Sequence, residues 1–300
     1  MTELLLLAVL DGLAYAALVF MVAVGLTLIF GVLRVLNVAH GSFYAIGAYT
    51  ATSLVIGLGA AGWSPYLAYP ALIISAVLVG ALLGGLIETV LLRRVYVKEE
   101  VLTLLVTFAV FMILEDVQRL VWGVSPMFAD APLSLLGTLA VGQVYYTAYQ
   151  LLLLPAAAVV VLVALRWFLR STLQGRLIVA VAHDREAAMA MGINAKRVYM
   201  TTFMIGATLA ALGGALASPT TSLTPGIGTD MIVLSFAVVA TAGLGQVEGA
   251  AVTAVLLGLG RSFAVYLYPE MQVLMPYLIM VVVLLFRPQG LFGVAEMRKV

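Results

Sequence analysis

Residues 9–30 read VLDGLAYAALVFMVAVGLTLIF, and Asp11 is the one charged side chain in this run. An α-helix rises about 1.5 Å per residue, so about 20 apolar residues are needed to cross roughly 30 Å of hydrocarbon. The run has this length and predicts a membrane-spanning helix. A secretory signal peptide begins with a cationic segment, whereas the first charges here are Glu3 and Asp11 and the first cation is Arg34. We therefore expect the helix to be retained.

The composition of the whole chain extends this expectation. Of 300 residues, 64% are hydrophobic and 10% are charged, and the mean hydropathy is +1.17, whereas a soluble domain is about 45–50% apolar and about 25% charged. The net charge of +1 provides no basic surface for nucleic acid. The absence of cysteine excludes a disulfide framework, a thiolate metal site and an iron–sulfur cluster. The sequence predicts an all-α, polytopic helix bundle embedded in the lipid bilayer.

Hydropathy predicts a single transmembrane domain over residues 1–300 with about eight or nine membrane segments. The candidate segments are 9–30, 38–57, 66–92, 101–123, 148–169, 199–217, 231–244, 249–268 and 271–286. Segment 38–57 is rich in Gly, Ser, Tyr and Thr, and segment 231–244 is short and flanked by glycines. Each of these two segments therefore either spans or re-enters the membrane. The pair Gly80 and Gly84 favours close helix packing.

Positive charges predict the orientation, because Lys and Arg are retained in cytoplasmic loops. With the N-terminus outside and nine segments, 13 of the 15 Lys and Arg residues fall on the cytoplasmic side, and Arg119 and Arg261 fall toward the outside. The cytoplasmic set is Arg34, Arg93, Arg94, Lys98, Arg166, Arg170, Arg176, Arg185, Lys196, Arg197, Arg287, Arg298 and Lys299. We expect a cytoplasmic C-terminus, and a re-entrant segment 38–57 would move the N-terminus alone to the inside.

Signatures of catalysis are absent from the sequence. A P-loop needs a lysine directly after glycine, and no lysine of this chain follows a glycine. Neither His40 nor His183 lies in an H-E-x-x-H pattern, and no G-x-S-x-G elbow occurs. Two distant histidines also make a metal site improbable. We therefore predict no catalytic centre, no cofactor and no metal.

The longest internal hydrophilic stretch, RSTLQGRLIVAVAHDREAAMAMGINAKRV at 170–198, is cytoplasmic by the charge argument. Ser171 or Thr172 can cap a first helix, and Asp184 can cap a second, short helix that ends at Gly192. This second helix is rich in alanine, and its narrow body favours docking into a groove on a soluble partner. The alternative is a helix lying on the membrane, although its apolar side is short and lacks Trp and Phe.

Asn37, His40 and Gly41 are the first candidates for lining a solute path. They lie where the first segment turns into the second, and the exposed N-terminus of a helix attracts a carboxylate. The alternative is that these residues form a packing and turn motif.

Glu115 and Asp116 are the second pair of candidates, because ionisable groups inside a membrane segment are candidates for function. Arg119 follows them at helical spacing and can neutralise both on one helix. The alternatives are a local structural pair or an outer vestibule. Arg261 has no partner nearby in the sequence, so we expect it to pair across helices or to extend toward the interface.

Three blocks of sequence resemble a known family. The stretch REAAMAMGINAKRVYMTTFMIGATLAALGGAL at 185–216 looks like the cytoplasmic coupling loop and following span of bacterial ABC-importer permeases. The stretch GLTLIFGVLRVLNVAHGSFYAIGAYTA at 25–51 and the ending LLFRPQGLFG at 284–293 are similar to the branched-chain amino acid subgroup. The resemblance covers nearly the full chain and indicates the shorter permease subunit (LivH type).

The resemblance implies a subunit of a multi-chain importer rather than an enzyme. The implied partners are a second homologous permease, two cytoplasmic ATPase subunits and a periplasmic or extracellular solute-binding protein. The implied location is the bacterial plasma (inner) membrane, crossed several times. The residues implied to couple the permease to the ATPase are Asp184, Arg185, Glu186, Ala187, Ala188, Met189 and Gly192.

Other functions stay open at this point. Importers of urea and short amides share these sequence blocks, so branched-chain or other amino acids are one of two solute classes. A proton-coupled secondary transporter using Glu115 or Asp116 is a further alternative. The predicted docking helix separates the two kinds of transporter, because a self-contained carrier does not need one.

Overall fold

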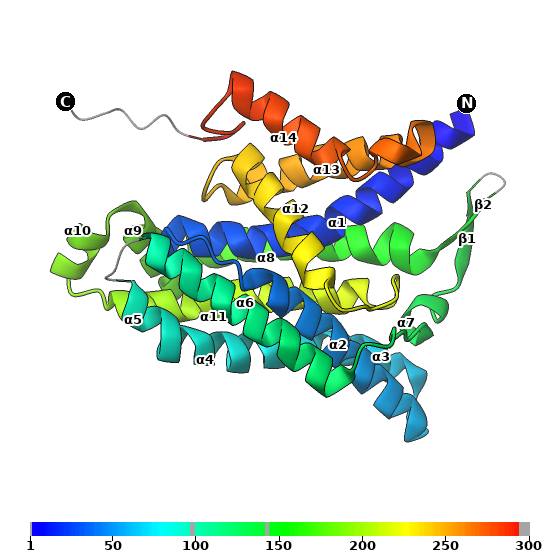
Figure 1. Cartoon of the computed structure of the whole chain (residues 1–300), viewed down its shortest axis with the longest axis horizontal. Helices are drawn as coiled ribbons and strands as arrows, with labels where there is room; N and C mark the ends of the chain where they lie inside the picture. The colour runs from blue at the N-terminus through cyan, green and yellow to red at the C-terminus, as the bar shows by residue number, and fades with distance from the viewer. Residues whose placement is uncertain (1, 97–99, 142–143, 294–300) are drawn as a thin grey trace.

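The computed structural model describes residues 2–96, 100–141 and 144–293, which form an elongated helical bundle (Figure 1). The elements are α1 (Thr2–Leu33), α2 (His40–Ala60), a 3₁₀ turn (Pro65–Leu67), α3 (Ala68–Leu78), α4 (Gly85–Ile87), α5 (Arg93–Val95), α6 (Glu100–Trp122), α7 (Ala131–Ser134), β1 (Thr138–Val141), β2 (Val144–Thr147), α8 (Leu154–Ser171), α9 (Leu173–His183), α10 (Arg185–Ala190), α11 (Ala195–Ala217), α12 (Ile227–Ala242), α13 (Val247–Leu267), a 3₁₀ turn (Pro269–Met271) and α14 (Met275–Phe286). We call the end that carries α9 and α10 the inner end and the end that carries β1 and β2 the outer end.

The helices correspond to the predicted membrane segments. Among the described residues, seven helical stretches are long and apolar enough to cross a membrane, and α12 and α14 are shorter apolar helices. One stretch, Pro65–Val95, is continuous from α3 to α5 through two π-helical turns, at Val79–Gly84 and Glu88–Leu92. The helical membrane bundle is therefore confirmed, while the number of crossings stays a prediction. Lys98, Arg298 and Lys299 lie outside the described residues.

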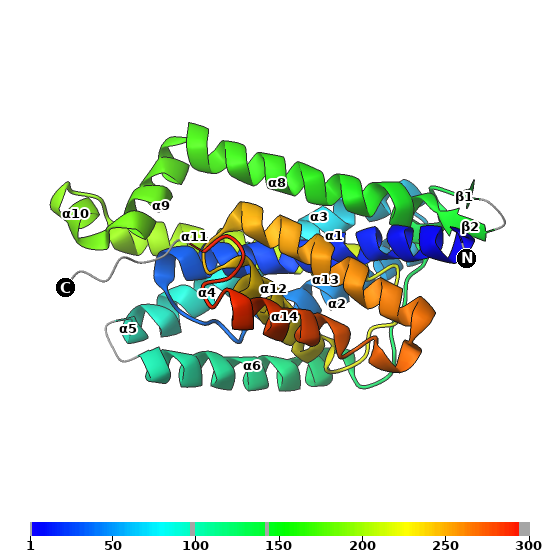
Figure 2. The same ribbon diagram turned by 90° about the horizontal axis from the view of Figure 1, so that it is seen from above.

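Helix α1 forms the centre of the bundle. Its residues Met21, Val22, Ala23 and Val24 have no exposed surface, and it packs against α8, α11, α12 and α13. Figure 2 shows α8 and α6 on opposite sides of this centre. Helices α6 and α8 both expose many large apolar side chains, as expected for helices that face lipid.

Helix α2 begins beside the middle of α1. The ring of His40 donates from Nε2 to the carbonyl oxygen of Val22 at 3.0 Å, so the chain between α1 and α2 turns back into the bundle before the helix starts. Thr107 of α6 holds this connection, because its hydroxyl donates to Leu36 O and accepts from Val38 N, both at 3.3 Å. These bonds satisfy backbone groups that lipid cannot hydrogen-bond.

Helices α2 and α11 touch without intervening side chains. A Cβ atom at Gly214 would overlap the carbonyl oxygen of Tyr44, and one at Gly47 would overlap the backbone of Ala211. Gly80, which the sequence marked as a packing residue, touches α11 in the same way. Small residues allow membrane helices to approach this closely, and the dispersion attraction between their backbones then drives their association.

The segment after α14 caps the inner end of α12. Leu291 N donates to Thr241 O at 2.8 Å, and Phe292 N donates to Ala242 O at 2.9 Å. The last carbonyl groups of a helix have no partner inside the helix. The stretch 284–293 therefore has a structural role, because it supplies the missing donors.

One element was not predicted from the sequence. Strands β1 and β2 form an antiparallel hairpin at the outer end, with Thr138 opposite Thr147. Tyr146 of β2 lies beside Asp11 and Tyr266, and the hydroxyl of Tyr266 donates to Asp11. Burial, followed by the Asp11 carboxylate, raises the pKa of Tyr146. The hairpin is thereby tied to α1 and α13.

We predict that Gly214→Ala destabilises the bundle, because the added methyl group meets the backbone of α2. Overpacking of this kind costs about 1–3 kcal/mol. Gly57→Ala is the matched control, since no atom lies within 4 Å of its added Cβ, and replacing a helical glycine by alanine is otherwise favourable. Thermal unfolding of the detergent-purified protein should show a lower midpoint for Gly214→Ala only. Equal midpoints in the two variants would contradict the packing described here.

Labelling of single cysteines can test the predicted orientation, because the natural chain has no cysteine. Met191 after α10 and Tyr145 in β2 have exposed fractions of 73% and 75%. We expect an impermeant thiol reagent to label Tyr145→Cys in intact cells and Met191→Cys only in inside-out vesicles. Labelling of Met191→Cys in intact cells would contradict the predicted orientation and indicate the opposite one.

Candidate functional site

The hydrophilic stretch 170–198 folds into α9, α10 and the start of α11 at the inner end (Figure 1). The hydroxyl oxygen of Thr172 accepts from Gly175 N at 3.0 Å and caps α9. The carboxylate of Asp184 accepts from Ala187 N at 3.0 Å and caps α10. The sequence predicted the Asp184 cap, which is confirmed, and offered Ser171 or Thr172 for the first helix, of which Thr172 is the cap.

Gly192 ends the short helix, as its place in the sequence predicted. Its φ angle is +85°, in the left-handed region that side chains with a Cβ adopt at a cost. Its amide donates to Met189 O at 3.0 Å, and the amide of Ile193 donates to Ala188 O at 3.1 Å. This is the hydrogen-bonding pattern of a glycine C-terminal cap.

Helix α10 presents most of its surface to the surroundings. Ala188 is the one buried residue of the helix, with an exposed fraction of 1%. The other residues implied to contact an ATPase are exposed, namely Asp184, Arg185, Glu186, Ala187, Met189 and Gly192. The helix therefore has one attached side and a broad free surface of acidic, alanine and methionine side chains.

Aromatic contacts attach α10 to the bundle. The guanidinium of Arg185 lies 5.5 Å from the ring centroid of Tyr199 on α11. The ring of Tyr199 packs edge-on against Tyr96, just after α5, at 5.3 Å between centroids. The buried Glu88 carboxylate pairs with Arg93 at 3.3 Å in the same region. These five side chains line a cavity of about 440 Å³, so α10 contacts the inner ends of two membrane segments through them.

The position of Tyr96 makes its hydroxyl a poor acid. Burial, and then the neighbouring Glu88 carboxylate, raises the pKa of Tyr96. Its hydroxyl is therefore protonated at neutral pH. Tyr96 and Tyr199 carry no signal of this role in the sequence, since aromatic residues near a membrane boundary are common.

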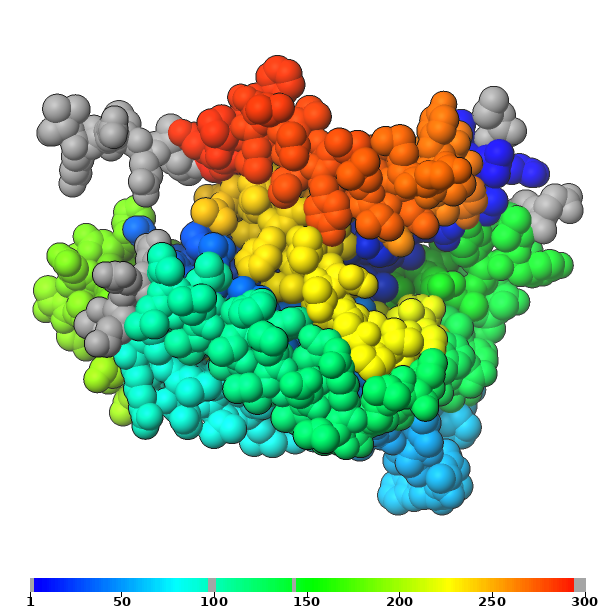
Figure 3. Space-filling model, viewed as in Figure 1, coloured from blue at the N-terminus to red at the C-terminus, as the bar shows by residue number. Residues whose placement is uncertain are grey.

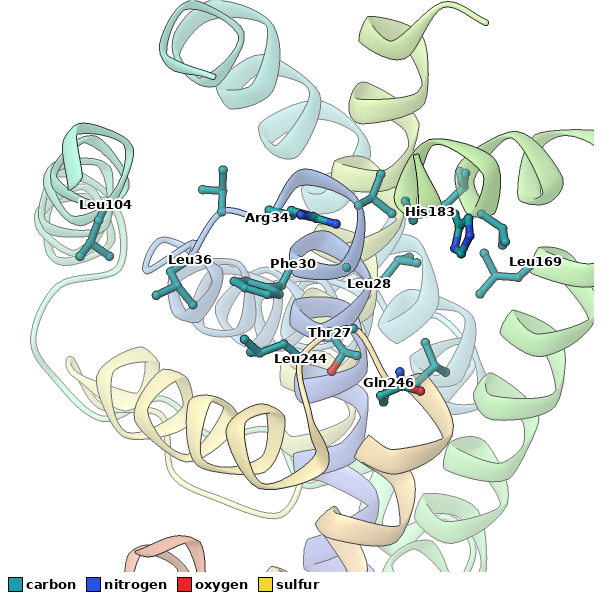
Figure 4. A pocket seen from close by; sticks show the side chains of 18 of the residues that line it. Thr27, Leu28, Phe30, Arg34, Leu36, Leu104, Leu169, His183, Leu244 and Gln246 are labelled. Carbon is teal, nitrogen blue, oxygen red and sulfur yellow. The ribbon is translucent and has the colours of Figure 1, made fainter. Parts of the chain in front are cut away.

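A larger cavity of about 980 Å³ lies beside this region, at the inner end of α1 (Figure 4). Its polar lining includes Arg34 after α1, His183 at the end of α9 and Gln246 before α13, while Phe30 and Leu104 contribute apolar surface. The cavity joins α1 to α9 and to the turn between α12 and α13. This cavity could not be predicted from the sequence, because its lining comes from distant segments.

The residues Asn37, His40 and Gly41 lie inside the bundle. Asn37 and His40 have no exposed surface, and Gly41 touches the backbone of Gly228 at the start of α12. Neither amide atom of Asn37 has a hydrogen-bond partner among the described residues. None of the three residues lines either cavity described above. Their role in lining a path stays a prediction.

Glu115, Asp116 and Arg119 form the local cluster that their spacing predicted. Arg119 donates to Glu115 at 2.7 Å and pairs with Asp116 at 3.5 Å. The cluster lies in the outer part of α6, and the exposed fractions of the Glu115 and Asp116 side chains are 21% and 72%. A role for the two acids in lining a path stays a prediction.

A second ionic cluster lies at the inner end and was missed by sequence analysis. Arg166 and Arg170 of α8 contact the Glu248 carboxylate of α13 at 3.1 and 3.3 Å. The partners are about 80 residues apart, so spacing in the sequence gives no signal for the pairing. The cluster joins α8 to α13 close to the start of α9.

Comparisons with known proteins agree with this architecture. Residues 8–284 match the family described as branched-chain amino acid transport system / permease component. The chain is 27% identical over 297 residues to the high-affinity branched-chain amino acid transport system permease protein LivH of Salmonella typhimurium, covering 97% of this chain and 96% of LivH. The corresponding protein BraD of Pseudomonas aeruginosa gives the same identity and coverage. The probable LivH of Methanocaldococcus jannaschii is 25% identical, covering 95% of this chain and 92% of that protein.

A solved structure supports the fold. The chain resembles PsaBC from Streptococcus pneumoniae in complex with Fab, with a TM-score of 0.51 and 15% identity, over 93% of this chain and 91% of that one. At this identity the likeness concerns the fold alone. The family match over residues 8–284, with relatives aligned along almost the whole chain, establishes that this multi-pass membrane protein belongs to the branched-chain amino acid transport permease family.

Proposed function

We propose that the chain is one of two permease subunits in an ATP-driven importer of branched-chain or other amino acids. ATP is hydrolysed by two separate cytoplasmic ATPase subunits, and an external binding protein delivers the solute. Branched-chain amino acids are the solutes named for LivH and BraD. The proposed location is the plasma (inner) membrane.

The exposed helix α10 is the observation that carries this proposal. A six-residue helix is far below the length at which isolated helices are stable, yet α10 has a side-chain cap at one end and a glycine cap at the other. Five of its six residues are exposed. A preorganised, exposed surface suits contact with a partner, because little conformational entropy is lost on binding.

The attachment of α10 suggests how movement reaches the bundle. A change of position in α10 displaces Arg185 and the ring of Tyr199, and Tyr199 lies on α11. The contact of Tyr199 with Tyr96 links the same movement to the third membrane segment. An ATPase can shift this equilibrium only if its contacts with α10 differ between two states of the permease.

The alternative functions receive less support. Urea and short-amide permeases share the sequence blocks, but the relatives described above are named for branched-chain amino acids. A proton-coupled carrier would use Glu115 or Asp116, and both acids are ion-paired with Arg119 at the outer part of α6. Such a carrier would also have no need for α10.

Reconstitution tests the proposal directly. The permeases, ATPases and binding protein are placed in vesicles, and uptake of radiolabelled leucine and of urea is measured. We expect uphill uptake of leucine that requires ATP and the ATPase subunits and that survives collapse of the proton gradient. Uphill uptake by the permease alone, or uptake of urea in place of leucine, contradicts the proposal.

Substitutions at Gly192 test the role of α10. Gly192→Val places a β-branched side chain at φ +85°, a conformation that costs about 1–2 kcal/mol per residue, so we expect leucine uptake to fall by a factor of about 5 to 30. Gly192→Asn is the matched control, since asparagine tolerates this conformation, and it should keep most of the activity. No atom lies within 4 Å of the added Cβ, so both variants should reach the membrane in normal amounts.

A charge reversal provides a second test of the same surface. Glu186 is exposed in the first turn of α10, so Glu186→Lys leaves the packing of the bundle unchanged. We expect the variant to lose uptake and to retain fewer ATPase subunits during purification. Wild-type uptake in both Gly192→Val and Glu186→Lys would falsify the docking role.

A further inference from the structure

The cavity of about 980 Å³ at the inner end of α1 is open to the surroundings of the bundle. Arg34, Leu36 and Leu104 line it, and all three are exposed, the two leucines by 42% and 38%. Figure 3 shows this part of the chain, in blue, recessed between α6 in teal and α12 in yellow. In the orientation predicted from the positive charges, the opening faces the cytoplasm.

The wall of this cavity is mostly aliphatic. Leucine, isoleucine and valine side chains from α1, α6, α8, α9 and the turn before α13 form most of it. Its polar side chains are Thr27, Arg34, His183 and Gln246. No lining residue in the described part of the chain is acidic. The cavity therefore combines a large apolar surface with the positive charge of Arg34.

Arg34 has a strained backbone at the edge of the cavity. It directly follows α1, its φ angle is +54°, and it is the one non-glycine residue with a positive φ in the described ranges. Helices commonly end with a residue in this left-handed conformation, and that residue is usually glycine. Non-glycine residues with such strain persist where the surrounding structure holds them, and they cluster at ligand sites. An arginine at this position therefore indicates a role for its side chain.

The guanidinium of Arg34 is free to bind an anion. Among residues 2–96, 100–141 and 144–293, no carboxylate lies within 4.0 Å of it. A guanidinium presents five N–H donors in a planar fork and binds a carboxylate through two of them. Figure 4 shows Arg34 and His183 on one side of the cavity and Thr27 and Gln246 on the other. The side-chain carbonyl oxygen of Gln246 can accept from an ammonium group.

An aliphatic wall with one unpaired cation is complementary to a solute that has an aliphatic side chain and a carboxylate. We propose that this cavity is the chamber from which a branched-chain amino acid leaves for the cytoplasm, with its carboxylate on Arg34 and its side chain against the aliphatic wall. This inference rests on the proposed function and adds the residues that hold the solute at the inner end. Urea fits neither part of the chamber, because it has no carboxylate and no apolar surface.

The chamber shares a wall with the elements that carry α10. Ile178 and His183 of α9 line it, and His183 directly precedes Asp184, which caps α10. A displacement of α10 by an ATPase therefore moves one wall of the chamber. An ion pair at an exposed arginine contributes little to binding, so the chamber holds its solute weakly. Weak binding suits release, because a solute held too tightly would not leave.

Protection of single cysteines from a thiol reagent tests the chamber in inside-out vesicles that carry the complete importer. Leu36→Cys and Leu104→Cys place the label in the lining, and Met191→Cys is the control, since it is exposed at the same end outside the lining. We expect millimolar leucine to slow labelling of the first two at least threefold and to leave the control unchanged. Isocaproate, which lacks the ammonium group, should also protect. Isoamylamine, which lacks the carboxylate, should not.

Substitutions of Arg34 separate the effect of its charge from that of its backbone. Arg34→Gly and Arg34→Asn both remove the charge, and both new residues tolerate a positive φ, so neither should lower the thermal midpoint of the purified permease. We expect half-maximal protection to require about tenfold more leucine or higher, because a hydrogen bond to a charged group is lost. Leucine uptake should fall in both variants. Arg34→Lys keeps the charge and should retain part of the protection.

Each outcome has a defined meaning. Equal labelling of both lining cysteines with and without leucine, or no labelling of either without leucine, overturns the chamber and leaves the proposed function intact. Unchanged protection in Arg34→Gly overturns the assignment of the carboxylate to Arg34. Labelling that the ATPase subunits block without leucine assigns the cavity to the ATPase contact and also overturns the chamber. A reconstituted wild-type importer that moves no leucine contradicts the proposed function itself.

Discussion

Direct backbone contact between helices is the constraint on which the rest of this structure depends. Lipid is as apolar as a leucine side chain, so burying apolar surface does not hold membrane helices together. Dispersion attraction stabilises the bundle instead, where Gly47 and Gly214 bring α2 against α11. Gly25 and Gly206 join α1 to α11 in the same manner. Because these close approaches leave no room for a methyl group, they also fix the relative positions of the helices.

Features governed by neighbouring residues could be predicted from the sequence. The membrane segments follow from runs of apolar residues, and the caps at Thr172 and Asp184 follow from side chains that reach an amide three residues ahead. Gly192 ends α10 because the left-handed conformation favours glycine. The ion pair of Glu115 with Arg119 follows from a spacing of one helical turn.

Features governed by distant residues could not be predicted. The start of α2 beside Val22 depends on the bond from His40, and nothing in the local sequence indicates that depth. The partner of Arg261 is Tyr15, some 250 residues earlier in the chain. The hydropathy of a bundle cannot identify such pairs, because nearly every position around them is apolar.

The two ends of the permease are connected through α11 and α1. Arg185 of α10 rests on Tyr199 of α11, and α11 meets α1 at Gly206 and Gly25 without a side chain between them. A displacement of α11 at the inner end therefore passes to α1, since close-packed backbones have no soft layer that absorbs it. Further along α1, Tyr15 shares its ring with Arg261. A contact that holds α10 differently in two states of the protein would therefore also shift α1 and the pairing of Tyr15 with Arg261.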